Sequence, residues 1–346
     1  MRKVADRVLI CFVILFLLIP LVTFNFAKNQ KSVIENRNLA ELTDVRSGYT
    51  KFRKSLLAYV NDRIGGRDYF LKTYDIVMYK YLHHKHKKVI PGKDGWLFYF
   101  EGLPDYTGEN QNAALVEQEV RILKKLDQRC KDMGIIFVYE VCPNKSTIYS
   151  EYMPDYIYHT PISQTDRLIA RLKDEGIKIC YPKQELLDHH MEDELYMKLD
   201  THWNVKGAGY LFDEFTDLLH LQKRDFPMNP SFSSSGDLRN MVGVSLDDAQ
   251  SKVFSIENNK DARINIHERE ATIENPDGIK FVVYRDSFTS NLLPYYQYYF
   301  TGPVHWKYKI DFDELEKEKP KVVILECVER YVRNSIFANQ DVLKTK

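Results

Sequence analysis

The sequence is informative first in what it lacks. Its 49 basic and 49 acidic residues cancel, so we expect no strong electrostatic field and no nucleic-acid partner. It contains no glycine-rich loop of the kind that binds dinucleotides or phosphates, and no cofactor is predicted. Hydrophobic residues nevertheless make up 44% of the chain, which excludes wholesale disorder and predicts a folded protein.

Cysteine is also scarce, with five in 346 residues. Their spacings give neither a compact disulfide framework nor a Cys-x-x-Cys metal pair. Cys142, Cys180 and Cys327 fall in predicted buried strands and Cys130 on the apolar side of a predicted helix, where a free cysteine packs as a small hydrophobe. We therefore predict free thiols, although two strand cysteines could pair if their strands are neighbours.

Only one hydrophobic run is long enough to suggest a membrane segment. It extends from Val8 to Phe24, and its 17 residues would span about 26 Å as a helix, near the lower limit for crossing a bilayer. Arg2, Lys3 and Arg7 precede it, and no small-x-small cleavage pattern follows it. Residues 1–27 therefore predict an uncleaved signal anchor in the cytoplasmic membrane, with the rest of the chain outside.

After the anchor, the sequence changes character twice. Residues 28–47 are polar and predict a linker, and residues 48–346 predict one folded domain. From residue 89 onward, strand and helix patterns alternate, which is typical of a mainly parallel sheet with helices on both faces, an α/β fold. Residues 222–275 are rich in Ser, Asn and Asp and predict an insertion or lid. The expected strands are 135–141, 177–180, 279–284, one around Val304, and 322–328. The expected helices are 48–63, 67–84, 115–133 (where apolar residues recur at helical spacing), 163–174, 205–221 and 311–319.

Two short motifs have the pattern of a catalytic triad. Asp200 and His202 are two residues apart, so in an extended segment they project from the same face and can touch. A carboxylate on one imidazole nitrogen leaves the other free as a general base. Ser287 follows the predicted strand 279–284, and the carboxyl end of a central strand is where α/β folds place a nucleophile. The alternative is that this serine only caps a helix.

The same residues carry a family resemblance. Asp200-Thr201-His202-Trp203-Asn204 followed by Gly207, with Arg285-Asp286-Ser287-Phe288 downstream, resembles the SGNH-hydrolase-like domain of the alginate O-acetyltransferases and related DHHW-motif proteins. The resemblance spans roughly residues 35–332. Further colinear matches are Glu35-Asn36-Arg37, Gly92 to Phe98, Pro143-Asn144-Lys145 with Tyr149 and Pro154, Gly236-Asp237-Leu238, and Leu325-Glu326 with Glu329-Arg330.

This resemblance implies an SGNH-like fold and an acyl-enzyme formed on Ser287. It favours transfer of acetyl groups onto an extracytoplasmic polysaccharide, with a multi-spanning membrane O-acyltransferase as the partner that supplies acetyl equivalents from the cytoplasm. Water or a sugar hydroxyl could resolve the acyl-enzyme, so a carbohydrate acetyl esterase of the same fold is the first alternative. A non-catalytic scaffold for polysaccharide synthesis is the second.

The chain departs from the wider SGNH pattern at the expected oxyanion hole. Arg285 replaces the glycine of the usual Gly-Asp-Ser block, and no Gly-x-Asn-Asp block is present. The backbone N–H of Ser287 is the first candidate donor to an oxyanion. Further candidates are Arg285, Asn144, Lys145 and Arg330.

Three other interpretations compete with these roles. Arg330 could form a structural ion pair with Glu326 or Glu329. Trp203 could shield the triad from water or fill the core, and the two roles are compatible. Imidazole and carboxylate are also the usual ligands of hydrolytic metals, so a loose cluster offers a metal centre as a rival to the triad: His189, His190, Asp193, Asp200 and His202.

Overall fold

The computed structural model describes residues 37–76, 88–242 and 249–344, together with scattered residues between 7 and 32. The predicted anchor lies mainly outside the described residues. Among the described helices, none is long and apolar enough to span a bilayer. By their internal contacts, residues 1–89 with 237–247 form one compact unit, the small unit, and residues 90–236 with 248–346 form the large unit.

The small unit contains the two helices predicted after the linker. They are α2 (Tyr49–Arg63) and α3 (Arg67–Ile76), and the segment before them pairs briefly as β1 (Lys31–Ser32) and β2 (Arg37–Asn38). The first helix holds this segment, because Asp62 accepts a hydrogen bond from the Ala40 amide at 2.7 Å and Arg63 donates to the Ala40 carbonyl at 2.6 Å. The histidine-rich run that ends the second predicted helix lies outside the described residues.

A seven-stranded sheet forms the centre of the large unit. Its first five strands are parallel neighbours, and the last two are antiparallel. The sheet is therefore mainly parallel, as the sequence predicted, and an antiparallel edge of two strands makes it mixed. In spatial order the strands are β6 (Ile179–Cys180), β5 (Ile136–Cys142), β13 (Val322–Val328), β11 (Ile279–Tyr284), β12 (Phe300–His305), β10 (Glu270–Glu274) and β9 (Arg263–His267).

The antiparallel edge comes from the segment predicted as an insertion. Within residues 222–275, β9 and β10 form a hairpin that pairs with β12 and so extends the main sheet. The preceding part forms a separate ladder of β7 (Met228–Ser233) and β8 (Ser251–Ile256). A hairpin interrupts the strand-helix alternation on which the sequence prediction rested, which is why the edge was not foreseen.

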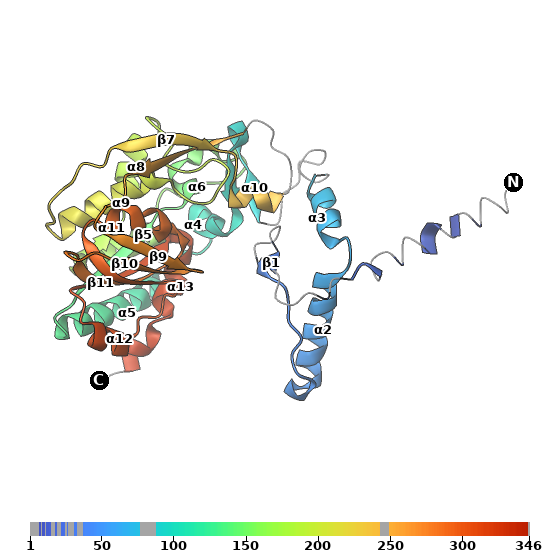
Figure 1. Cartoon of the computed structure of the whole chain (residues 1–346), viewed down its shortest axis with the longest axis horizontal. Helices are drawn as coiled ribbons and strands as arrows, with labels where there is room; N and C mark the ends of the chain where they lie inside the picture. The colour runs from blue at the N-terminus through green and yellow to red at the C-terminus, as the bar shows by residue number, and fades with distance from the viewer. Residues whose placement is uncertain are drawn as a thin grey trace. The chain divides into compact units, whose positions relative to one another are not determined.

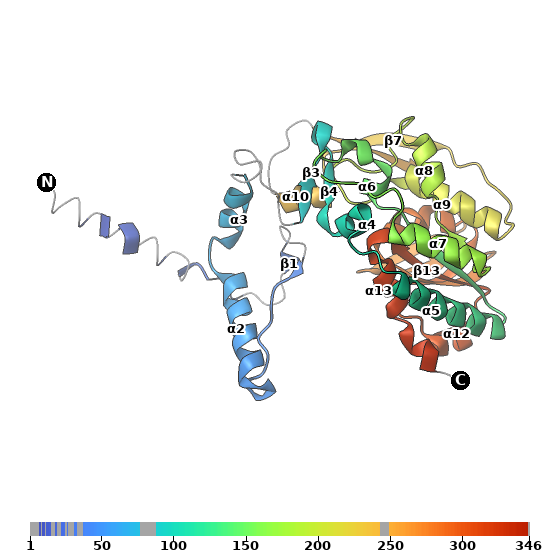
Figure 2. The same cartoon turned by 180° about the vertical axis from the view of Figure 1, so that it is seen from behind.

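Helices cover both faces of the sheet, as predicted. On one face, α5 (Ala113–Asp132) and α7 (Gln164–Asp174) lie side by side (Figure 2). The helices α12 (Phe312–Glu318) and α13 (Val332–Phe337) contribute to the same core. The opposite core contains α6 (Lys145–Ile148), α8 (Lys183–His189), α9 (Val205–Leu218) and α11 (Leu293–Tyr296) (Figure 1).

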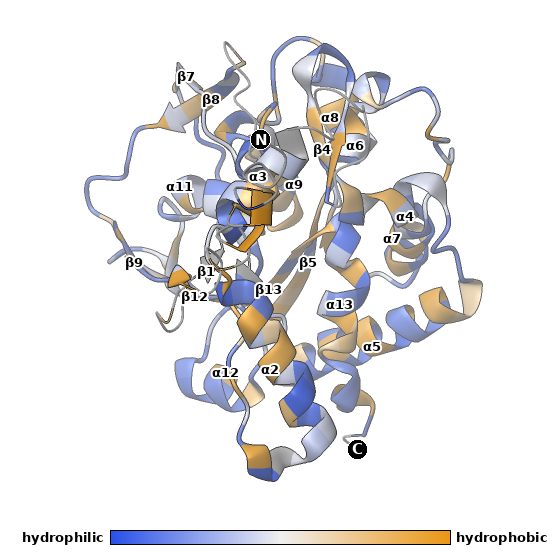
Figure 3. Cartoon of the chain, turned by 90° about the vertical axis from the view of Figure 1, so that its right-hand side faces the viewer, coloured by the Kyte–Doolittle hydropathy of each residue, from blue (hydrophilic) through white to orange (hydrophobic). Residues whose placement is uncertain are grey.

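The central strands are apolar on both faces, because each is covered twice. All seven residues of β13 are buried, and its side chains alternate between the two cores, with Ile324 on one side and Leu325 on the other. Figure 3 shows β5 and β13 as hydrophobic strands in the middle of the sheet. Cys130, Cys142, Cys180 and Cys327 are buried free thiols, which confirms that prediction for the described cysteines.

The strand order places the functional candidates at one edge. Because β13 lies between β5 and β11 and all three are parallel, their carboxyl ends lie next to one another. Asn144 follows β5, Arg330 follows β13 and Ser287 follows β11. Such a crevice at the carboxyl edge of a parallel sheet is the usual binding site of an α/β fold.

Candidate active site

The first half of the site is a tight hairpin of residues 195–204, which we call the His loop. Tyr196 and Trp203 form its single bridge, and the Met197 amide donates to the His202 carbonyl at 3.0 Å. Asp200 lies at the turn, where its carboxylate accepts the His202 amide at 3.0 Å. Asp200 and His202 therefore touch as predicted, but through a side-chain turn and not through an extended strand.

The second half is the turn from β11 into the short helix η6 (Ser287–Asn291). Asp286 is the N-cap of this helix, and its carboxylate accepts the Phe288 amide at 2.9 Å. The other oxygen of Asp286 accepts the Val328 amide at 2.8 Å and the Tyr308 hydroxyl at 2.9 Å. A helix cap is thus present at the Asp-Ser pair, as the alternative held, but Asp286 and not Ser287 makes it. Because Asp286 makes the cap, the serine hydroxyl is left for another partner.

That partner is the imidazole of the His loop. Ser287 Oγ lies 2.6 Å from His202 Nε2, and His202 Nδ1 lies 2.5 Å from Asp200 Oδ1. The imidazole and carboxylate side chains are 20% and 15% exposed, so the pair is mostly withdrawn from water but reachable. A hydroxyl that donates to an imidazole, which in turn donates to a carboxylate, is the arrangement of an activated serine nucleophile.

Two reciprocal hydrogen bonds join the two halves. The indole N–H of Trp203 donates to the Phe288 carbonyl at 3.1 Å, and the Asn291 amide side chain donates to the Trp203 carbonyl at 2.8 Å. Trp203 is fully buried and its ring lies 5.5 Å from that of Phe288. The Phe288 ring is in turn 4.9 Å from the His202 ring. Trp203 therefore fills the core and fixes the serine turn to the His loop.

Lys145 supports the His loop from within. Its ammonium donates to the carbonyls of Met197, Lys198 and Asp200 at 3.1, 3.2 and 2.5 Å, and it lies 5.6 Å from the centre of the Trp96 ring. The residue is only 4% exposed. A buried ammonium needs acceptors, and here these belong to the loop that carries Asp200. The structure thus gives this oxyanion candidate a positioning contact.

The motifs of the family resemblance converge on the same support. Trp96 stacks on Tyr149 with ring centroids 4.3 Å apart. The Tyr149 hydroxyl accepts the Leu195 amide at 2.8 Å, at the first residue of the His loop. At the other side, the Tyr196 hydroxyl donates to the Pro143 carbonyl at 2.7 Å. The loop is therefore held against the segment that follows β5.

Two further oxyanion candidates lie together. Arg330 donates to the side-chain oxygen of Asn144 at 3.0 Å, and its guanidinium lies 5.3 Å from the Phe288 ring. No ion pair joins the described Arg330 to Glu326 or Glu329, so the predicted ion pair is wrong.

These two carboxyl groups instead accept hydrogen bonds from their own neighbours. Glu329 accepts the Asn144 amide and the hydroxyls of Thr147 and Tyr181. Glu326 accepts the Asp286 amide at 3.0 Å, as well as the Thr289 hydroxyl and the Cys142 thiol. Their role is to fix the ends of the three central strands.

Arg285 is engaged away from the serine. Its guanidinium donates to the carbonyls of Asp286 and Arg269, each at 2.9 Å, and lies 4.6 Å from the Trp306 ring. Burial lowers the pKa of Arg285 from its usual value. These contacts join the serine turn to the β9–β10 hairpin. The oxyanion candidates that remain are the Ser287 N–H, Asn144 and Arg330, of which Arg330 contacts the ring of the neighbouring Phe288.

Below the site lies a pair of buried carboxyl groups. From the sequence, Glu326 was named only as a motif residue and a possible partner of Arg330, and Glu140 was not named. Glu140 and Glu326 are register partners on β5 and β13, and both are fully buried. Burial raises the pKa of Glu326 well above its usual range and that of Glu140 to about 8. Tyr296 donates to Glu140 at 2.7 Å. Each lies in an otherwise apolar run, so periodicity gave no signal for them.

The structure does not assemble the rival metal cluster. His189 and His190 contact Glu192 and Glu151 respectively. Asp193 accepts hydrogen bonds from two lysines, at 2.7 and 3.0 Å. Of the five residues of that cluster, Asp200 and His202 pair with each other, and the other three contact neighbours outside it.

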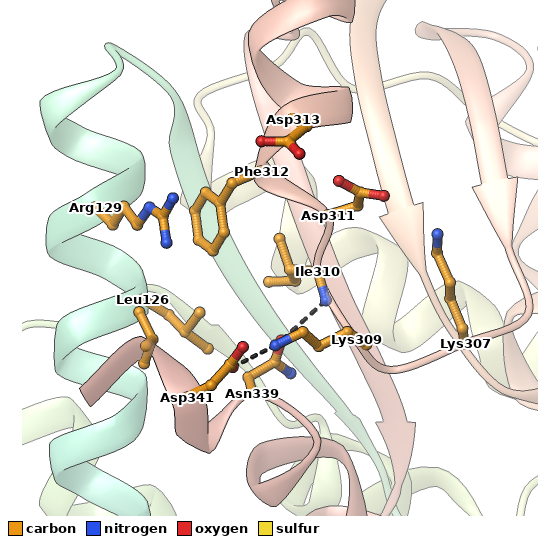
Figure 4. Close-up of a pocket in the computed structure, with 11 residues that line it drawn as sticks. Leu126, Arg129, Lys307, Lys309, Ile310, Asp311, Phe312, Asp313, Asn339 and Asp341 are labelled. Carbon is orange, nitrogen blue, oxygen red and sulfur yellow. Dashed lines mark hydrogen bonds and ion pairs between the residues drawn. The ribbon is translucent and has the colours of Figure 1, made fainter. Parts of the chain in front are cut away.

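Among the hollows of the large unit, one lies on the far side of α5. It measures about 320 Å³ and is lined by charged residues around the start of α12. Figure 4 shows that Lys309 pairs there with Asp341 and that the Ile310 amide donates to Asn339. It contains no serine or imidazole.

The comparisons with known proteins bear on the family and the fold. Residues 89–252 match the family described as "SGNH hydrolase-like domain, acetyltransferase AlgX". The resemblance predicted from the motifs is thereby confirmed. No curated protein matches the chain in sequence.

Solved structures extend the likeness to the fold. PatB1 of Bacillus cereus aligns with a TM-score of 0.55 at 15% identity, over 71% of this chain and 97% of that one. A DHHW family protein of Eubacterium siraeum gives 0.52 at 13% identity, over 74% and 98%. The O-acetyltransferase domain of Pseudomonas putida AlgJ gives 0.47 at 17% identity, over 71% and 92%. The family match over residues 89–252, with the first two of these structures, shows that the large unit has an SGNH-like α/β fold.

Proposed function

We propose that this protein is an O-acetyltransferase that moves acetyl groups onto a cell-surface polysaccharide through an acyl-enzyme on Ser287. The single observation that carries the proposal is the chain of hydrogen bonds from Ser287 through His202 to Asp200, at 2.6 and 2.5 Å. The match of residues 89–252 to an acetyltransferase family supports the acetyl group as the unit transferred.

The first half-reaction loads the serine. Ser287 Oγ attacks the carbonyl carbon of an acetyl donor while its proton passes to His202 Nε2, and Asp200 stabilises the resulting imidazolium. The oxyanion that forms is bound by the Ser287 N–H, with Asn144 and Arg330 beside it. As the tetrahedral intermediate collapses, the bond to the donor oxygen breaks and His202 returns the proton to the leaving group.

The second half-reaction runs the same steps with a sugar hydroxyl as the attacking group. Its proton passes to His202 Nε2, a bond forms between the sugar oxygen and the acetyl carbon, and Ser287 leaves with the proton. Water in place of the sugar would give a carbohydrate acetyl esterase, and the partial exposure of the His202 side chain, 20%, keeps this as the second candidate. A scaffold has no need of an imidazole between a serine and a carboxylate.

The proposal also includes the cellular location of the reaction and the source of the acetyl groups. The apolar run 8–24 anchors the protein in the cytoplasmic membrane, with the catalytic domain outside. Acetyl-CoA is cytoplasmic, so a partner must carry acetyl equivalents across the membrane. A multi-spanning membrane O-acyltransferase is the partner type that the family resemblance implies.

A deletion and complementation experiment tests the proposed reaction. The gene is deleted, and O-acetyl groups on the cell-surface polysaccharide are measured with and without plasmid copies. We expect loss of acetylation, rescue by the wild-type gene and no rescue by Ser287→Ala, because removal of a triad nucleophile lowers turnover by about three to six orders of magnitude. Ser290→Ala is the matched control, since Ser290 lies in the same short helix and is exposed.

Other outcomes separate the alternatives. A rise in O-acetyl content on deletion would indicate the esterase. Acetylation restored by Ser287→Ala as well as by wild type would indicate the scaffold. Acetylation that is unchanged by the deletion would refute the transferase role.

A further inference from the structure

A second hollow of the large unit lies beside the candidate active site. It measures about 200 Å³ and is lined by residues of α4 (Leu103–Thr107), α5 and α7 and by the segment that follows β13. Arg330 forms part of its wall. Since this arginine also contacts Asn144 and the Phe288 ring, one side chain separates the cavity from the serine turn.

Unpartnered polar atoms gather in this cavity. The described residues contain eight buried side-chain nitrogen or oxygen atoms without a hydrogen-bond partner, and four of them belong to residues that line it. They are Glu119 Oε2, Asp105 Oδ2, Asn110 Oδ1 and Arg330 Nε. Glu119 is 1% exposed and Asp105 4%. Buried polar atoms are nearly always paired in folded proteins, so the cavity is built to hold something polar.

The chemistry of these atoms selects the occupant. Three are acceptors and one is a donor, so the ligand must mainly donate hydrogen bonds and accept at least one. The lining carries four carboxyl groups, those of Glu101, Asp105, Glu119 and Glu329, and two guanidinium groups, those of Arg330 and Arg333. This excess of carboxyl groups disfavours an anionic ligand. Hydroxyl groups both donate and accept.

The volume of the cavity restricts the possible ligands further. At about 30 Å³ per molecule of liquid water, the cavity of about 200 Å³ holds several waters or one small polyhydroxylated ring. The larger hollow of Figure 4 offers a contrast within the same unit, because none of the eight unpartnered atoms of the described residues belongs to its lining.

We propose that this cavity is the subsite for one sugar residue of the acceptor polysaccharide. Hydroxyl groups of the sugar donate to Glu119, Asp105 and Asn110, and one accepts from Arg330. The inference rests on the proposed transferase function and adds to it the place where the acceptor chain binds. From there, the neighbouring sugar of the same polymer extends past Arg330 towards Ser287.

Acceptor kinetics test the subsite. The full-length protein in detergent is given 4-nitrophenyl acetate as donor and, as acceptor, size-fractionated polysaccharide from the deletion strain. For Glu119→Gln we expect the KM for the acceptor to rise about tenfold with a smaller change in kcat, the loss expected for one charge-assisted hydrogen bond. Asn334→Trp, at an exposed residue of the cavity wall, should raise the same KM by blocking entry.

The control and the contrary outcomes are defined by the same assay. Asp313→Asn makes the matched carboxyl-to-amide change in the hollow of Figure 4 and should leave both constants at the wild-type value. If both cavity variants melt like wild type and keep the wild-type KM for the acceptor, the cavity holds ordered water only and the subsite is refuted.

A second measurement separates this inference from the proposed function. If the wild-type protein transfers no acetyl group to the fragments, the transferase proposal fails and the subsite is judged by calorimetry on Ser287→Ala. Fragment binding that weakens about tenfold when Glu119→Gln is added supports the subsite. Equal binding by the two proteins, or none by either, overturns it.

Discussion

At the scale of single residues, the buried carboxyl group of Glu140 makes the free energy of unfolding depend on pH. Burial raises its pKa from 4.5 to about 8, so the folded protein keeps this proton over a range in which the unfolded chain has lost it. The folded state therefore binds more protons between these two values, and the free energy of unfolding falls as the pH rises through that window.

Glu140→Gln should remove this dependence. Glutamine cannot ionise, yet its side-chain oxygen still accepts the Tyr296 hydroxyl. We expect the variant to match wild type near pH 4 and to gain on it by about 1.4 kcal/mol for each pH unit up to about pH 8. Urea denaturation of the full-length protein across this range measures the difference.

The control for this change is Glu316→Gln, at an exposed residue of α12. Its stability difference from wild type should not vary with pH. A Glu140→Gln protein whose stability follows that of wild type at every pH would show that Glu140 titrates normally in the folded state.

At the scale of elements, the His loop is held by the ammonium group of Lys145, which donates to three of its carbonyls. Lys145→Met should leave three loop carbonyls without their donor and shift Asp200 relative to His202. Because misplacement of a catalytic group by about 1 Å can cost about 100-fold, we expect kcat/KM for 4-nitrophenyl acetate to fall by about that factor. Lys145→Arg, which retains a cation, should recover part of the loss.

The control variant is Lys183→Met. It also removes a partly buried lysine, but this lysine pairs with Asp166, at 2.8 Å, and not with the His loop. That variant should keep wild-type kinetics. The pH-rate profile gives a second readout, because a displaced Asp200 alters the apparent pKa of the general base whereas a general loss of stability does not. Wild-type kinetics for Lys145→Met would contradict the positioning role.

The elements differ in how far their sequence determines them. The strands 279–284 and 322–328 were predicted with the bounds that the structure has, because both are mainly apolar runs between polar turns. The last four residues of the first and all seven of the second are buried. Asp200, His202 and Ser287 were also found from spacing, since a carboxylate two residues from an imidazole restricts the chemistry. Their catalytic roles stay predictions.

What the sequence did not predict comes from long-range order. Arg330 meets Asn144 only because β13 lies beside β5, and no local pattern encodes that neighbourhood. Lys145 reaches the His loop across more than fifty residues for the same reason. The β9–β10 hairpin was predicted to be part of an insertion because residues 222–275 are rich in Ser, Asn and Asp and interrupt the strand-helix alternation, although both strands alternate between polar and apolar residues.

At the scale of the whole molecule, the open prediction concerns the membrane. The anchor over residues 8–24 predicts that the protein fractionates with membranes and that protease added to intact spheroplasts digests the globular part, while a cytoplasmic marker survives. Amino-terminal sequencing should find an uncleaved chain. A mature terminus near Lys28 would disprove the anchor, and a protected domain would disprove the outward orientation.

The position of β13 near the end of the chain also determines when the support of the serine turn is completed during synthesis. It is the last of the seven strands of the large sheet to be synthesised, yet it lies between β5 and β11, which do not pair with each other. It also brings the Val328 amide that holds Asp286 and hence the serine turn. Ser287, His202 and Asp200 all leave the ribosome earlier, but their support is incomplete until residue 328 has followed. A nascent or truncated chain can thus contain all three candidate residues without this support, and we expect it to be inactive until its synthesis has passed the central strand.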